Sequence, residues 1–151
     1  MHDQRPPRGW PRIAPTLFYD DAAAAIDWLT RVFGFEVRVR VDDPDGRVVH
    51  SQLAFGEGLV MVGLQAGANH SAPRKSPRSM DGANTQSLLV HVDDVDAHCS
   101  RARDAGATIL TEPATQDYGP EYWADPIYLA EDLEGHQWWF TQRVREANEQ
   151  S

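Results

Sequence analysis

Residues 88–110 read LLVHVDDVDAHCSRARDAGATIL, and this stretch decides the fold. It joins a strand pattern, two aspartates, a helical pattern, Gly106 and a second strand pattern. An aspartate before a helix accepts hydrogen bonds from its free N–H groups, and a glycine after a helix adopts the left-handed conformation that ends it. The same order occurs earlier, in IAPTLFYDDAAAAIDWLTRVFGF at residues 13–35. We therefore expect two copies of one structural unit.

The two copies are offset by about 73 residues, since Asp21 and Asp94 hold equivalent places (94 − 21 = 73). A sheet covered on one face by one helix leaves its other face open, and two such units can enclose a cavity. The pattern predicts an α+β fold of two βαβββ modules that form a cupped mixed sheet around one cavity. The three strands after each helix are expected at 35–41, 47–55 and 59–64 in the first copy and at 107–113, 126–131 and 136–142 in the second.

The remaining segments lie around these modules. We expect an irregular, proline-containing arm over residues 1–11, in which Trp10 is the residue that can dock it onto the body. A single domain then covers 12–141, and a polar tail covers 142–151. Within the domain, module one spans 12–65 and module two spans 86–141. A linker or lid with few apolar residues joins them at 66–85, where Arg74, Lys75 and Arg78 can meet an anionic ligand or remain solvated.

Composition narrows the class of partner. The 151-residue chain has a formal net charge of −9, which disfavours nucleic acid and anionic membrane surfaces. Cys99 is the only cysteine, so an internal disulfide is impossible, as is usual in a reducing compartment. The chain shows no secretory signal pattern and no apolar run long enough to span a bilayer. We expect a cytoplasmic protein whose partner is a small molecule.

Four segments carry a resemblance to a known family. Two are the stretches quoted above, and the others are HSQLAFGEGLVMV at 50–62 and YLAEDLEGHQWWF at 128–140. In this order and spacing they resemble the vicinal oxygen chelate superfamily of glyoxalases, bleomycin resistance proteins and dioxygenases, and within it the PhnB-like members. The resemblance implies the two-module fold and a homodimer.

The resemblance also implies where a metal would be held. Metal-dependent members use one inward-facing residue on each of four strands, and the matching positions here lie near Ala14, Val62, Ser87 and Trp139. Zinc, iron and nickel take imidazole nitrogen or carboxylate oxygen from at least three side chains. These residues offer neither, so we expect no metal and no other cofactor. A metal-dependent glyoxalase-like or dioxygenase enzyme remains an alternative only if histidines converge in another register.

The cavity is expected to bind a small, apolar or aromatic ligand. Trp139, at a former metal position, offers a flat wall on which a ring can stack, or it fills the space that a metal would take. Tyr122 and Trp123 belong to a loop expected at the cavity mouth, where they contact ligand or pack against the sheet edge. The full set of candidate ligand-binding residues is Phe18, Phe55, Ser87, His91, Tyr122, Trp123, Gln137 and Trp139.

Whether the chain is an enzyme stays open. His91 and His50 are the candidate catalytic residues, because either can act as the base of a metal-independent lyase or isomerase. Each can equally be a hydrogen-bonded wall residue. We expect His98 to be exposed on the second helix and Cys99 to be buried. Asp132 and Glu134 are expected to form a turn and not a catalytic pair.

Overall fold

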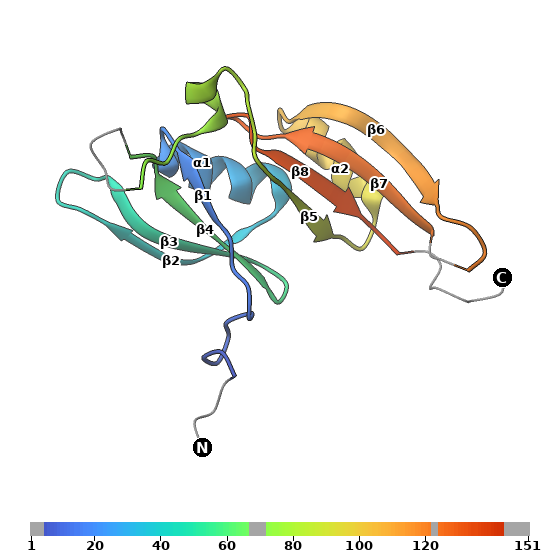
Figure 1. The fold of residues 1–151 in the computed structure, drawn as a ribbon, viewed down its shortest axis with the longest axis horizontal. Helices are drawn as coiled ribbons and strands as arrows, with labels where there is room; N and C mark the ends of the chain where they lie inside the picture. Colours follow the sequence, from blue (N-terminus) through green and yellow to red (C-terminus); the bar gives the residue numbers. More distant parts are fainter. Residues whose placement is uncertain (1–4, 67–71, 122–123, 144–151) are drawn as a thin grey trace. The chain divides into compact units, whose positions relative to one another are not determined.

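The computed structural model describes residues 5–66, 72–121 and 124–143. It shows the expected α+β fold with two similar modules (Figure 1). The chain forms two compact units, residues 1–81 and 82–151, and each unit contains one four-stranded mixed sheet with a helix against one face. The boundary between the units falls inside the segment predicted as a linker.

The first unit follows the predicted order of elements. Its sheet has the spatial order β1-β4-β3-β2, in which β1 and β4 are parallel and the other neighbours antiparallel. Asp21 caps the helix, because its Oδ1 accepts a hydrogen bond from the N–H of Ala24 at 3.0 Å. The elements are β1 (Thr16–Tyr19), α1 (Ala22–Trp28), a π-helical turn (Leu29–Phe33), β2 (Glu36–Asp42), β3 (Val48–Phe55) and β4 (Gly58–Leu64).

The second unit repeats this arrangement, with the order β5-β8-β7-β6 and a parallel β5–β8 pair. Asp94 caps its helix through the N–H of Ala97 at 3.0 Å. Gly34 and Gly106 follow the two helices with φ values of 91° and 110°, the left-handed conformation in which glycine has no steric penalty. The elements are β5 (Ser87–His91), α2 (Val95–Asp104), β6 (Thr108–Asp117), β7 (Ala124–Glu131) and β8 (Gln137–Thr141).

The core of the first unit lies between α1, its π-helical turn and one face of the sheet. Ser51 is a polar group within this core, and its hydroxyl bonds both the carbonyl and the N–H of Val62, at 2.6 and 3.1 Å. Its hydrogen-bonding capacity is thus met without water. The buried apolar side chains on this face and on the helix include Leu17, Tyr19, Ala25, Ile26, Leu29, Phe33, Leu53, Val60 and Val62.

In the second unit, the prediction that His98 is exposed is wrong. Its side chain is only 4% exposed, and its Nδ1 lies 2.6 Å from the hydroxyl of Tyr128. The imidazole also packs on Phe140, with ring centroids 4.3 Å apart. The physical reason is helical spacing: positions 95, 98, 99 and 102 share the face that α2 turns to the sheet. The prediction that Cys99 is buried is confirmed.

The segment predicted as an unpacked linker contains ordered structure. A short 3-10 helix spans Pro77–Met80, and a single β-bridge joins Ala66 to Arg74. The buried Ser76 donates its N–H to the side-chain carbonyl of Gln65 at 3.0 Å. These polar contacts and a proline in the first helical turn order the segment, although it has few apolar residues.

Replacing Tyr128 with Phe removes the hydroxyl that His98 bonds inside the core. We expect the variant to lose about 1–3 kcal/mol of unfolding free energy, because a buried polar atom loses a partner. Urea unfolding followed by circular dichroism measures this. The matched control is Tyr118→Phe, at a side chain that is 52% exposed, and its change should stay within about 0.5 kcal/mol. Equal stability of wild type and Tyr128→Phe would contradict the assignment.

Because of Tyr128, we also expect the free energy of unfolding to depend on pH in the alkaline range. Burial raises the pKa of Tyr128 above the ordinary value of 10.0, so the folded chain keeps a proton that the unfolded chain releases. The stabilising contribution is therefore complete below pH 10.0 and is lost as the pH rises above it. We expect wild-type stability to fall more steeply above pH 10.0 than that of Tyr128→Phe. If the stability of wild type and of Tyr128→Phe fell with the same slope above pH 10.0, the pKa of Tyr128 would be the same in the folded and the unfolded chain.

Candidate functional site

Each sheet presents one face that its helix does not cover. Successive side chains on a strand point to opposite faces, so about half of each strand's residues lie on the side away from the helix. We call these the first open face, on residues of β1 to β4, and the second open face, on residues of β5, β7 and β8. Each is described within its own unit.

The second open face is built from three strands in register. In the middle, Leu89 of β5 pairs with Trp139 of β8, which pairs in turn with Leu129 of β7. Leu89 is 56% exposed, which is a high value for a leucine beside a tryptophan on a sheet. We call these three residues the apolar row.

Polar residues flank the apolar row. On one side lie Ser87, Gln137 and Glu131, which pair across the same three strands. On the other side lie His91 and Thr141, and the hydroxyl of Thr141 donates to the carbonyl of Pro126 at 3.0 Å. The structure thus brings four of the predicted ligand-binding residues onto one face: Ser87, His91, Gln137 and Trp139.

On the first open face, one position implied by the resemblance needs correction. Val62 is only 1% exposed and pairs with the buried Leu17, so its side chain points to the helix-covered face. The residues of β4 on the open face are its neighbours Met61 and Gly63. Ala14 lies before β1 begins. Met61 offers only a thioether sulfur, and Gly63 has no side chain. Neither residue supplies the imidazole nitrogen or carboxylate oxygen that zinc, iron or nickel takes.

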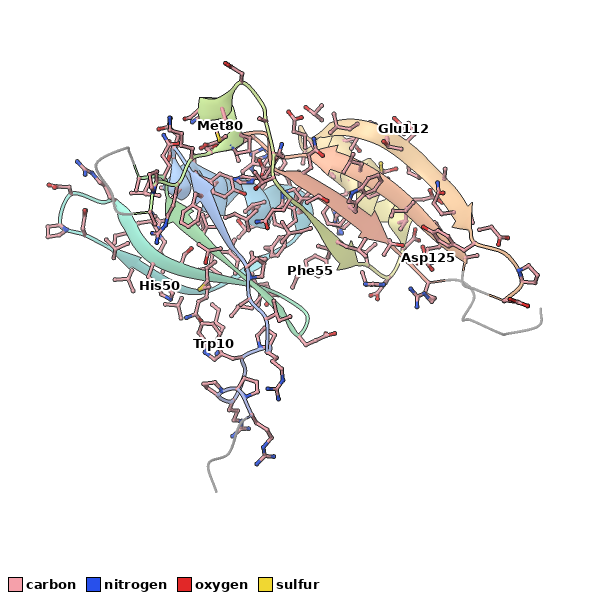
Figure 2. The ribbon with its side chains drawn as sticks, in the orientation of Figure 1. Trp10, His50, Phe55, Met80, Glu112 and Asp125 are labelled. Carbon is pink, nitrogen blue, oxygen red and sulfur yellow. The ribbon has the colours of Figure 1, made fainter. Side chains whose placement is uncertain are left out.

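Phe18 and Phe55 do not come together. Phe18 lies on the first open face, where the guanidinium carbon of Arg74 is 5.1 Å from the centre of its ring. Phe55, labelled in Figure 2, ends β3. It packs edge-on against the buried Phe35, with ring centroids 5.3 Å apart. Its ring contacts the segment that follows the first helix. The structure therefore gives Phe55 a packing role and leaves Phe18 on the open face.

His50 lies on the first open face with a polar neighbour that the sequence prediction missed. The Nε2 of His50 is 2.9 Å from the amide nitrogen of Gln52, two residues along β3. An amide nitrogen can only donate, so neutral His50 accepts at Nε2 and holds its proton at Nδ1. Strand alternation was the signal that could have linked Gln52 to His50.

The donors of the two open faces do not fit the metal that the resemblance implies. Among the residues that the structure describes, no group of three or more histidine, cysteine or acidic side chains is placed to hold an ion. His50 instead has Gln52 beside it, and His91 pairs with Thr141. Tyr122 and Trp123, the predicted loop contacts, lie outside the described residues. None of the described helices is long and apolar enough to cross a membrane.

The arm before β1 docks onto the first unit as expected for Trp10. Trp10 is labelled in Figure 2. The guanidinium carbon of Arg38 lies 5.7 Å from the ring centre of Trp10, and Nη1 of Arg38 donates to the carbonyl of Gly9. Gly9 has a φ of 83°, a left-handed conformation that glycine adopts without steric cost and that other residues rarely adopt. A half-open hollow of about 390 Å³ lies between the arm and the β3–β4 hairpin.

Asp132 and Glu134 belong to the β7–β8 turn, as predicted. Oδ1 of Asp132 accepts from the N–H groups of Glu134 and His136, at 3.1 and 3.0 Å. Its Oδ2 accepts from the indole N–H of Trp138 at 3.0 Å. Asp132 is only 5% exposed, so this carboxylate organises the turn and anchors the largest core side chain of the unit.

The fold and the site geometry define a two-module βαβββ protein with open sheet faces, and sequence comparison identifies its family. The family model of the Glyoxalase/Bleomycin resistance protein/Dioxygenase superfamily matches residues 12–140, and the chain belongs to that superfamily.

Individual relatives are similar to this chain along most of its length. An uncharacterized protein of Mycobacterium tuberculosis is 35% identical over 138 residues, which are 91% of this chain and 78% of that protein. The crystal structure of TioX from Micromonospora sp. ML1 is 32% identical, with a TM-score of 0.68 over 89% of this chain and 99% of that one. A superfamily member from Sphaerobacter thermophilus shares the fold at 18% identity, with a TM-score of 0.59 over 85% and 94%.

Asp132→Ala should destabilise the protein by about 2–4 kcal/mol, because it leaves a buried indole N–H and two backbone N–H groups without their acceptor. Asp43→Ala is a matched control. In the β2–β3 turn, Asp43 accepts from the N–H groups of Asp45 and Arg47, each at 2.9 Å. Its described donors are thus two backbone N–H groups, without the indole N–H that Asp132 also binds. Thermal and urea unfolding of both variants measure the difference. A smaller loss for Asp132→Ala than for Asp43→Ala would contradict the anchoring role of the Trp138 bond.

Proposed function

We propose that this protein binds a small, planar, apolar or aromatic ligand on the second open face, without a metal. The observation that carries the proposal is the apolar row, in which the exposed Leu89 lies beside Trp139 and Leu129. Apolar surface left in water is a favourable docking place for a ring, and burying it removes that surface from water.

The arrangement around the apolar row supports selective binding. Trp139 offers the face of an indole, the largest stacking surface that a side chain provides. Ser87 and Gln137 on one side and His91 on the other supply hydrogen-bond donors and acceptors. Small-molecule sites usually combine an apolar floor with a few polar groups that fix orientation, and this face has both.

The proposal of metal-free binding rests on the chemistry of the side chains. The open-face residues at the implied ligand positions, or paired with them across strands, include no histidine and no acid; they are Thr16, Phe18, Met61, Gly63, Ser87, Leu89, Leu129, Gln137 and Trp139. Affinity then comes from stacking, desolvation and hydrogen bonds to neutral groups.

A second candidate function is a metal-independent lyase or isomerase. His91 favours it, because this imidazole lies on the second open face one pairing step from the apolar row and is exposed. His50 is less suited to be the base, since its Nε2 already accepts from Gln52. Proton abstraction by His91 would require a substrate whose acidic carbon lies over Trp139.

The proposal also covers the subfamily, the location and the oligomeric state of the protein. The four quoted segments support a PhnB-like position within the superfamily, and we propose that the protein works as a cytoplasmic homodimer. The buried, unpaired thiol of Cys99 is compatible with a reducing compartment. Light scattering of the purified protein tests the dimer, and a monomer at micromolar concentration would rule it out.

Replacing Trp139 with Leu tests the binding face. With the neutral aromatic probe N-phenyl-1-naphthylamine, we expect at least a tenfold loss of affinity by calorimetry, since about 1.4 kcal/mol of stacking and burial corresponds to tenfold. Quenching of tryptophan fluorescence by the probe should also decrease. The control is Trp28→Phe, a tryptophan on α1 that packs against Phe33. Equal weakening by both variants, or by neither, would contradict binding at Trp139.

A further inference from the structure

On the second open face, Glu131 lies beside the apolar row. It pairs with Gln137 across the β7–β8 pair. Leu129, two residues earlier on β7, belongs to the apolar row, so the two side chains point to the same side of the sheet. The residue between them, Ala130, pairs with the buried Trp138 on the covered face. The strand register therefore fixes a carboxylate next to an exposed apolar surface.

The register also sets how far this carboxylate lies from the indole. Trp139 is two residues beyond Gln137 on β8, so it is a diagonal neighbour of Glu131 across the β7–β8 pair. Diagonal neighbours in an antiparallel pair lie about 7–8 Å apart, a distance that long and aromatic side chains span. A ligand whose ring lies over Trp139 can therefore reach Glu131 through a short chain of about one or two carbons.

Glu131 has no positively charged partner among the residues that the structure describes. In the second unit, Arg103 and Arg143 are each paired with another acid. Arg101 belongs to α2, which lies against the covered face. The half-buried carboxylate of Glu131 is thus available to a cation that arrives on the open face.

The formal charge of the chain is concentrated in the same unit. Residues 82–151 contain 4 arginines, no lysine and 13 acidic side chains, a formal charge of −9 (4 − 13 = −9). Residues 1–81 contain 10 side chains of each sign, so their formal charge is zero. A field of this sign attracts cations to the second unit and repels anions from it.

We propose that Glu131 receives the ammonium group of a ligand whose ring lies on the apolar row. An ammonium donates hydrogen bonds to a carboxylate, and such charge-assisted bonds are stronger than those between neutral groups. The ligand class is then an arylalkylamine, in which a short carbon chain separates the ring from the charge. The inference rests on the proposed function for the ring, and it adds the charge of the ligand and the residue that selects for it.

Three probes with one naphthalene body separate the charge from the ring. They are 2-(1-naphthyl)ethylamine, a cation at neutral pH, 1-naphthaleneacetamide, which is neutral, and 1-naphthaleneacetate, an anion. By calorimetry, we expect wild type to bind the cation about tenfold more tightly than the amide, and the anion more weakly than the amide. Glu131→Gln should weaken the cation about tenfold and leave the amide within about twofold, because a charge-assisted hydrogen bond is lost.

The matched control is Glu112→Gln, the same substitution on the opposite face of the same sheet. Glu112 pairs with Arg103 of α2, so its side chain lies on the covered side. The control removes one negative charge from the second unit, and at physiological ionic strength exposed charges beyond about 8 Å are largely screened. The affinity of Glu112→Gln for the cation should therefore stay within about twofold of wild type. Circular dichroism and thermal unfolding of each variant establish that it is folded.

The outcomes separate this inference from the proposed function. Equal weakening of the cation in Glu131→Gln and Glu112→Gln would indicate a general charge effect and overturn the inference. A wild type that binds the cation no more tightly than the amide would also overturn it, as would an unchanged affinity of Glu131→Gln for the cation. The amide tests the proposed function by itself, since Trp139→Leu should weaken its binding. If neither the amide nor the cation binds wild type, both proposals fail.

Discussion

A single short helix lies against only one face of each four-stranded sheet. Helix α1 has seven residues and α2 has ten, and their apolar stripes meet the covered face alone. Because side chains alternate along a strand, this one-sided packing divides every strand into residues that hold the unit together and residues that remain available. Trp138 and Trp139 illustrate the division: one is fully buried and bonded to Asp132, and its neighbour lies on the open face.

The covered faces use their polar groups for internal hydrogen bonds. Ser51 satisfies the backbone of β4, and His98 bonds Tyr128 inside the second unit. Such buried groups are stabilising only while their partners remain, so they are structural elements and poor candidates for chemistry. We therefore propose that recognition takes place on the open faces, where Trp139 lies beside Leu89 and Leu129.

Much of the fold could be predicted from the sequence, because its signals are local. The aspartate caps, the glycines after the helices and the 73-residue repeat all depend on neighbours along the chain, and alternation alone placed Trp139 opposite Trp138. Features that depend on tertiary packing could not be predicted. A one-residue error in register moves a side chain to the other face, as with Val62, and the cation–π contact between Arg74 and Phe18 joins residues 56 positions apart (74 − 18 = 56). His98 was predicted to be exposed, although its helical spacing from Val95 and Ala102 places it on the buried face of α2.

The open faces are proposed to recognise a ligand through rings and hydrogen bonds, without the metal that the resemblance implies. The most direct test is the metal content of the full-length, untagged protein, measured by inductively coupled plasma mass spectrometry after exposure to zinc, nickel, manganese and iron and extensive dialysis. The account predicts well below one ion per chain for every metal. One retained ion per chain, lost when His91 or His50 is replaced by alanine, would contradict it.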